Sequence, residues 1–253
     1  STPIADIRWM GVLQRIALAY LGAGLVVLHV RLPGILLTTA VLVVGYALAL
    51  TYIPLDGHRG SFAEGQNLAD LVDARYLPGR PYLGNAWDPE GIVSTSGAIA
   101  SCLLGVLAGL LFLNDRLRPS ARVLLLLLIG VGLAAIGWYW GRHLPIIKKI
   151  WTPSFTLLSG GISIAALGLV HLVVDLLRLR FWIAPFLWIG ENPLFLYLSS
   201  RLFDLKGIAN RLAGGDVKEA LGHWGLAVQA LIPLGFILLV AWFLHRHRIR
   251  IRV

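Results

Sequence analysis

Two carboxylates stand close together in a segment that could bind a polar substrate. Asp88 and Glu90 are separated by one proline and follow directly after Trp87. Two carboxylates beside an aromatic ring can orient an amine or a sugar hydroxyl through charge-assisted hydrogen bonds. A structural alternative stays open, because acidic side chains are also favoured at the start of a helix by its dipole.

A second cluster combines two cations with an aromatic ring. Lys148, Lys149 and Trp151 lie within residues 145–152, at the opening of an apolar segment. These three residues are candidates for a ligand pocket. The alternative is an interfacial belt, since basic and aromatic side chains gather where a helix leaves the membrane.

Polar residues inside apolar segments are a third candidate group. A charge at membrane depth is costly and needs a partner or a function. Arg15 lies in the first apolar segment, and Glu191 and Asn192 precede Pro193 in the sixth. The proline predicts a kink whose freed carbonyl groups are satisfied by neighbours, whereas the carboxylate beside it equally suits a functional site. Arg15 is also a candidate counter-charge for Glu191.

No metal site or catalytic group can be recognised in the sequence. None of the seven histidines stands in a nucleophile or metal-ligand pattern, and the single cysteine, Cys102, lies in an apolar segment. A general base must reach the proton that it removes, and no spacing in the chain indicates such reach. The catalytic residue is therefore unknown at this point, and no metal is expected.

The composition places these residues in a membrane protein. Of the 253 residues, 57% are hydrophobic and 14% are charged, and the mean hydropathy is +0.77. One soluble core of this size could not bury that much apolar surface. The net charge is +9, but the arginines mostly stand between apolar segments, so lipid head groups are the expected partner and nucleic acid is not.

About seven apolar segments are long enough to cross a bilayer as helices. They lie at residues 10–30, 34–53, 92–113, 120–141, 152–177, 183–204 and 224–245. Their apolar runs do not alternate as lipid-facing strands would. The sequence thus predicts an all-α, polytopic membrane bundle that forms a single transmembrane domain over residues 1–253. One long polar insert, residues 54–91, interrupts the series and is a candidate functional loop.

Small residues recur every four positions in the third segment. Gly97, Ser101, Gly105 and Gly109 form a ridge on one helix face. Such a ridge allows another helix to approach closely, so we interpret it as a packing surface. It should hold the preceding residues, 85–91, rigidly at the membrane surface.

The distribution of basic residues predicts the orientation. One set of connections and the C-terminal tail carry most of the short-loop arginines, namely Arg31, Arg116, Arg118, Arg122, Arg178, Arg180, Arg246, Arg248, Arg250 and Arg252. By the positive-inside rule the C-terminus is cytoplasmic and the 54–91 loop is extracytoplasmic. The basic tail should anchor the last helix to anionic lipid.

Four short strings in this order resemble a known family. They are GVLQRIA at 11–17, WDPEGI at 87–92 with Ser94 and Thr95, KKIWT at 148–152 with Ser154 and Phe155, and GENPL at 190–194 with Tyr197. They are similar to the heparan-α-glucosaminide N-acetyltransferase family of transmembrane acyltransferases and its bacterial relatives. The resemblance extends from about Arg8 to the last helix.

The resemblance implies an acetyltransferase of the bacterial inner membrane. Such an enzyme takes acetyl from acetyl-CoA on the cytoplasmic side and delivers it to an amino-sugar or glycan acceptor on the far side. It implies an acceptor site at Asp88, Glu90 and Trp87. A donor site or pocket would then involve Lys148, Lys149, Trp151, Arg15, Glu191 and Asn192. A homo-oligomer is compatible with this interpretation.

Two departures from the family are visible. Members begin with further helices that carry an Asp-x-x-Arg-Gly string and a histidine thought to be catalytic, and neither string nor helices occur here. Ile147 also stands where the family usually has Asn. We therefore expect the larger C-terminal part of an acyltransferase, with no acetyl transfer by these 253 residues alone. A transporter or flippase, suggested by the broken sixth segment, and a non-catalytic scaffold are the alternatives.

The predicted orientation can be tested by labelling. A reporter fused after Val253 should read as cytoplasmic, and a tag near Gly65 should be accessible from outside, because the short-loop arginines stay on the cytoplasmic face. Opposite labelling at both positions would reverse the orientation and remove the acceptor-side role of the 54–91 loop.

Overall fold

The computed structural model describes residues 7–55, 57, 59–85, 87–215 and 222–251. Within these ranges the regular structure is helical, and an isolated bridge pairs Arg8 with Gly79. The predicted all-α class is confirmed. The chain divides into two compact units, Ser1–Leu177 and Arg178–Val253, and each is described by itself.

The first unit contains five long helices and one polar insert. The long helices are α1 (Val12–His29), α2 (Leu32–Tyr52), α4 (Ser94–Phe112), α5 (Pro119–Trp140) and α6 (Pro153–His171), which a π-helical turn, η3 (Leu172–Leu176), extends. Proline stands in the first turn of α2, α5 and α6, where its missing N–H costs nothing. The predicted loop contains α3 (Leu68–Tyr76) and the short η2 (Tyr82–Gly84).

The second unit contains one long helix and several short ones. Its elements are α7 (Ala184–Glu191), α8 (Pro193–Leu202), α9 (Leu205–Ala213), η4 (Gly222–Trp224) and α11 (Gly225–Arg246). The predicted segment 183–204 is split between α7 and α8, because Asn192 has the non-helical backbone angles φ −139° and ψ 50°. The interruption expected at residues 191–193 is therefore present.

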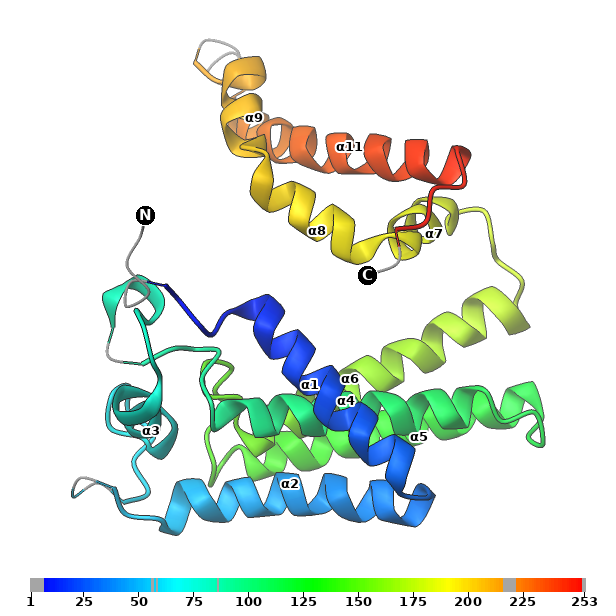
Figure 1. Cartoon of the computed structure of the whole chain (residues 1–253). Coiled ribbons are helices and arrows are strands. Elements are labelled where there is room, and N and C mark those ends of the chain that lie inside the picture. The colour runs from blue at the N-terminus through cyan, green and yellow to red at the C-terminus, as the bar shows by residue number, and fades with distance from the viewer. Residues whose placement is uncertain (1–6, 56, 58, 86, 216–221, 252–253) are drawn as a thin grey trace. The chain divides into compact units, whose positions relative to one another are not determined.

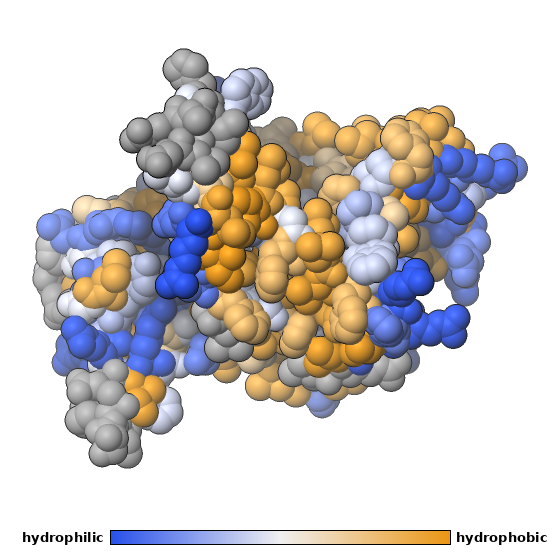
Figure 2. All heavy atoms as spheres, turned by 90° about the horizontal axis from the view of Figure 1, so that it is seen from above, coloured by the Kyte–Doolittle hydropathy of each residue, from blue (hydrophilic) through white to orange (hydrophobic). Residues whose placement is uncertain are grey.

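Six helices of the described chain are long and apolar enough to cross a membrane. They are α1, α2, α4, α5, α6 with η3, and α11, and the seventh predicted span differs because α7 and α8 are each too short. Much of their apolar surface faces outward, as at Leu28, which is 80% exposed, and Val131, which is 61% exposed. Figure 2 shows broad apolar patches beside hydrophilic regions on the face that it presents. The protein is a polytopic helical membrane protein.

Glycines set the closest helix contact, but not on the predicted ridge. Gly130, Gly137 and Gly161 bring the backbones of α5 and α6 so close that a Cβ would collide with the facing helix. On α4 a Cβ at Gly97 would meet Trp151, whereas Gly105 and Gly109 face open space. The ridge prediction is thus wrong for the C-terminal half of α4, because no neighbouring atom lies within 4 Å of a Cβ at Gly105 or Gly109.

Successive helices of the first unit run in opposite directions. The connection between α2 and α4 and the connection between α5 and α6 therefore meet at the same end of the unit (Figure 1). The N-terminal segment before α1 reaches this end as well. The alternation brings the polar insert and residues 141–152 together, although they are far apart in sequence.

Candidate functional site

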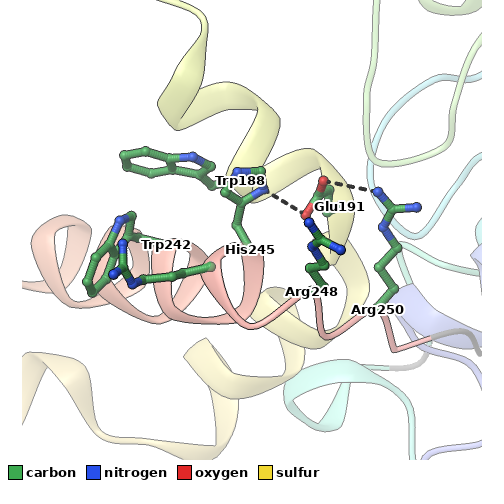
Figure 3. A pocket seen from close by; sticks show the side chains of 7 residues that line it. Trp188, Glu191, Trp242, His245, Arg248 and Arg250 are labelled. Atoms are coloured by element: carbon green, nitrogen blue, oxygen red, sulfur yellow. Dashed lines mark hydrogen bonds and ion pairs between the residues drawn. The ribbon is translucent and has the colours of Figure 1, made fainter.

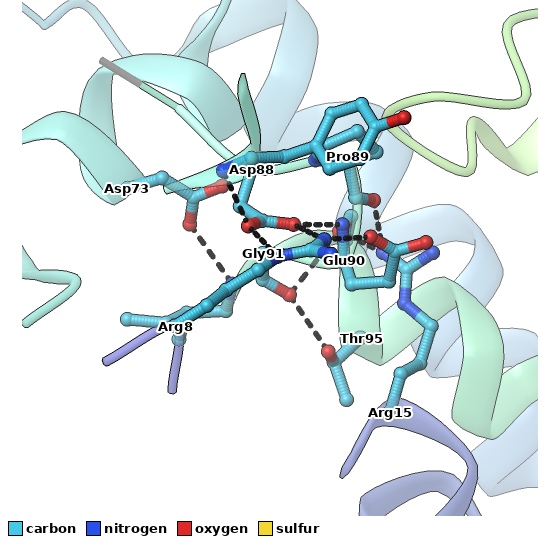
Figure 4. Close-up of polar contacts among 11 residues, drawn as sticks. Arg8, Arg15, Asp73, Asp88, Pro89, Glu90, Gly91 and Thr95 are labelled. Carbon is cyan, nitrogen blue, oxygen red and sulfur yellow. Dashed lines mark hydrogen bonds and ion pairs between the residues drawn. The ribbon is translucent and has the colours of Figure 1, made fainter. Parts of the chain in front are cut away.

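A buried carboxylate pairs with the arginine that precedes α1. The side chain of Asp88 has no exposed surface, and it accepts hydrogen bonds from Arg8 Nε at 2.7 Å and Arg8 Nη2 at 2.6 Å (Figure 4). The N–H groups of Tyr82 and Glu90 donate to it at 3.0 Å each. Burial alone would raise the pKa of Asp88, but these hydrogen bonds and the Arg8 charge together hold that pKa below its usual value.

Arg8 is positioned by a close backbone crossing. The N–H of Arg80 donates to the carbonyl of Ile7 at 3.2 Å, and Gly79 beside it has a φ of +82° with no room for a Cβ. Arg8 also contacts Glu90 Oε2 at 2.5 Å. The Glu90 side chain is 19% exposed. Glu90 is therefore the carboxylate of the pair that an outside group can reach.

Arg15 joins three segments at the start of α1. The residue is buried, and its Nη2 donates to the carbonyl of Pro89 at 2.7 Å and to the hydroxyl of Ser94. Its guanidinium also lies 5.0 Å from the centre of the Trp151 ring, a cation–π contact. Nε of Arg15 is buried with no hydrogen-bond partner among the described residues. Arg15 thus places Trp151 beside the Asp88–Glu90 segment.

Trp151 has a backbone conformation that is rare for a large residue. Its φ is +51°, in the left-handed region that a bulky side chain seldom adopts. The indole N–H donates to Ser101 at 2.9 Å, and Gly97 leaves space for the ring. Tyr46 of α2 donates to the carbonyl of Ile150 at 2.6 Å. These contacts hold the ring over Arg15 despite the unfavourable backbone angle.

The turn before Trp151 is built around Thr152. This fully buried residue accepts from the N–H of Ile147 at 3.0 Å and donates to the carbonyl of Pro145 at 2.9 Å. Ile147, the position at which the chain departs from the resembled family, contributes its backbone N–H to this turn. The turn fixes where the two lysines project.

The two lysines have different surroundings. Lys149 contacts Glu64 and lies 5.5 Å from the centre of the Trp87 ring. Lys148 is exposed, and no carboxylate of the described chain forms an ion pair with it. The structure therefore gathers Asp88, Glu90, Trp87, Lys149, Trp151 and Arg15 at one end of the first unit, with Lys148 at its surface.

Glu191 and Asn192 lie in the second unit, where each has its own partners. Glu191 pairs with His245 at 3.1 Å and with Arg250 at 3.5 Å. Asn192 is buried and bonds to the backbone of Ile249 and Ile251. The described contacts of Arg15 are with the first unit, so each member of the suggested Arg15–Glu191 pair already has another partner.

A cavity of about 470 Å³ begins at Trp151 and extends between α4 and α6. Small and hydroxyl-bearing residues line much of it, including Ser101, Gly105, Ser159, Gly160 and Ser163. The open space at Gly105 belongs to this cavity. Within the described residues, no group of three or more His, Cys, Asp or Glu side chains is arranged to hold a metal.

Two residues of the site were not found from the sequence. Arg8 is 80 residues away from Asp88, and nothing in the local sequence marks the pair. Asp73 on α3 accepts from the N–H of Ile92 at 2.9 Å, and its carboxylate lies where a Cβ at Gly91 would be. The spacing of Asp70 and Asp73, one helical turn apart, was the available signal, because two acids on one face of a short helix seldom both face solvent without partners.

The buried carboxyl of Asp73 gives a testable pH dependence. Burial raises its pKa to about 6, so folding disfavours the ionised form, and its contribution to stability is full below the unfolded pKa and is lost as the pH rises from about 4 to about 6. An Asp73→Asn variant can still accept from Ile92. Its melting temperature, relative to that of the wild type, should therefore increase across this pH interval. The corresponding gain in relative free energy of unfolding is roughly 1–3 kcal/mol. A difference that does not vary with pH would contradict the assignment.

Comparison with known proteins gives two matches. The chain is 28% identical to human heparan-alpha-glucosaminide N-acetyltransferase over 173 residues, which are 65% of this chain and 25% of the human protein. It is 28% identical to the mouse protein of the same name over 127 residues, which are 47% of this chain and 19% of the mouse protein. No protein-family model matches the chain. These two matches support a family relationship between this chain and heparan-alpha-glucosaminide N-acetyltransferase.

Proposed function

We propose that this chain forms part of a membrane acetyltransferase that transfers acetyl from acetyl-CoA to an amino-sugar or glycan. The observation that carries the proposal is the convergence on Arg15 of two separate polar strings, residues 88–94 and 148–152. Both strings resemble the acetyltransferase family, and the relationship to the human and mouse enzymes agrees with them. Their names indicate the glucosamine type of acceptor.

Within this proposal the two carboxylates have different roles. Asp88 accepts four hydrogen bonds and is fully buried, so it positions the segment. Glu90 is partly exposed, and Arg8 contacts its Oε2 alone, which leaves Oε1 for a further donor. We assign Glu90 to binding the amine or a hydroxyl of the acceptor, with Trp87 packing against the sugar ring.

The donor side is proposed from shape. The cavity between α4 and α6 begins at Trp151 and extends along both helices, away from the end of the unit at which Glu90, Trp87 and Lys149 lie. The hydroxyl groups of Ser101, Ser159 and Ser163 in its wall can accept from the amide groups of an extended chain, such as the arm of an acyl-CoA. The acceptor would meet the donor near Trp151, with the C-terminus on the cytoplasmic side.

A second candidate function is transport. The break between α7 and α8 at Asn192, beside Glu191, is the feature that favours it, since discontinuous helices with a charge often form transporter sites. A transporter would move the glycan without consuming acetyl-CoA. Measuring acetyl transfer and substrate uptake in the same vesicles separates the two functions.

The acetyltransferase proposal predicts distinct effects for the two carboxylates. In membranes from cells that express the protein from its whole gene, Glu90→Gln should reduce transfer of labelled acetyl to glucosamine about tenfold or more, roughly 1.4 kcal/mol, with little change in melting temperature. Asp88→Asn should lower both acetyl transfer and the melting temperature, because it removes the charge of the buried partner of Arg8.

Asp115→Asn is the matched control. Its side chain is 98% exposed, and it lies between α4 and α5, at the other end of the unit. It should leave both measurements unchanged. Wild-type acetyl transfer in Glu90→Gln would refute the acceptor role, and no transfer by the wild type would refute the proposed function.

A further inference from the structure

The second unit contains a separate polar pocket of about 830 Å³ at the end of α11. Its lining comes from α7, from the last turn of α11 and from the chain that follows, and it consists of Trp188, Glu191, Trp242, His245, Arg246, Arg248 and Arg250. In Figure 3 the two tryptophans lie on one side of His245, and Glu191, Arg248 and Arg250 lie on the other. The pocket thus has an aromatic side and a basic side.

The basic wall is an ordered part of the unit. After α11 the chain reverses at Arg248, whose φ is +55°, and the N–H of Ile249 donates to the carbonyl of Leu244 at 2.9 Å. Asn192 then holds the returning segment from both sides, because its amide donates to the carbonyl of Ile249 at 3.0 Å and its Oδ1 accepts from the N–H of Ile251 at 2.8 Å. A freely moving basic tail would have no such clamp.

The charges of the pocket are only partly balanced. Glu191 pairs with His245 and with Arg250. Arg246 lies 5.7 Å from the centre of the Trp242 ring. In residues 222–251 and the other described ranges, no carboxylate forms an ion pair with Arg246 or Arg248. The pocket therefore presents two guanidinium groups to an incoming anion, Arg246 against Trp242 on the aromatic side and Arg248 on the other side of His245, and its carboxylate is already paired.

We propose that this pocket binds the phosphate group of an organic phosphate ester. Guanidinium groups match phosphate oxygens in two-pronged geometry, and indole rings pack against an apolar or aromatic part of the same ligand. The apolar part of α11 ends at Leu244, so the pocket lies at the end of a candidate membrane span, at the depth of head groups. The ester is supplied by an anionic phospholipid or by the nucleotide of coenzyme A, and the second source rests on the proposed function.

Binding measurements on the purified chain test the pocket and separate its two sources. In phosphatidylcholine nanodiscs, coenzyme A and 3′,5′-ADP are titrated by calorimetry. In a second series phosphatidylglycerol replaces part of the lipid, and its affinity is obtained from the rise in melting temperature. Whichever of these ligands binds the wild type should bind the double variant Arg246→Gln/Arg248→Gln about tenfold or more weakly, which is ~1.4 kcal/mol.

Two further variants make the result interpretable. Arg116→Gln/Arg118→Gln removes the same charge from the connection before α5 and should change affinity less than about twofold. Glu191→Gln removes the carboxylate that pairs with His245 and Arg250 and so frees positive charge for the phosphate. It should tighten binding, a gain that misfolding cannot produce. Binding of the nucleotides would identify the donor cofactor as the source, and binding of phosphatidylglycerol alone would identify lipid.

The proposal is overturned if neither class of ligand binds, or if Arg246→Gln/Arg248→Gln binds the ligand as tightly as Arg116→Gln/Arg118→Gln does. Either result would leave acetyl transfer, measured separately in membranes, as the test of the proposed function. Acetyl transfer by a protein that binds neither class of ligand would refute the proposed phosphate site and leave the proposed function standing.

Discussion

The organisation of the first unit depends on one buried arginine that must be satisfied at the start of a membrane helix. A charge in that position is costly unless hydrogen bonds and nearby polar groups replace its water. Arg15 meets this requirement through Pro89, Ser94 and Trp151. The contacts that satisfy its charge are therefore the same contacts that bring two distant segments together.

The neighbouring features follow from that constraint. Trp151 keeps an unusual backbone angle because Ser101, Gly97 and Arg15 fix its ring. The carbonyl of Pro89 faces Arg15 while Asp88 turns to Arg8, so the two arginines hold the segment from opposite sides. Glu90, between these anchors, is left partly exposed on a rigid backbone, which is the preorganisation that a binding group needs.

The membrane-spanning helices could be predicted from the sequence, because their length and composition depend on bilayer thickness and hydropathy. The spans at 10–30 and 120–141 were predictable because a run of about 20 apolar residues is typical of a helix that crosses the bilayer. Pro193 indicated the break between α7 and α8. Hydropathy could not show that α7 and α8 stay short, nor that the insert contains α3. The site was found in part, because motifs marked Asp88 and Trp151.

The partners of those residues could not be predicted. Arg8 reaches Asp88 only through the antiparallel order of the helices and the backbone crossing at Gly79. Glu191 and Asn192 belong to a recognisable motif, yet their partners lie in the last turn of α11 and in the chain that follows it. Neither set of contacts can be predicted from sequence spacing, because both arise from tertiary packing.

Hydrogen–deuterium exchange on an Arg15→Leu variant tests most directly whether this arginine organises the site. We predict faster exchange in two segments at once, at Gly91 and at Trp151, since both lose a shared anchor. Arg122→Leu is the control, because Arg122 donates to the carbonyl of Phe112 at 2.9 Å at the other end of the unit and should affect that end alone. Faster exchange confined to α1, with Gly91 and Trp151 protected as in the wild type, would contradict the central role of Arg15.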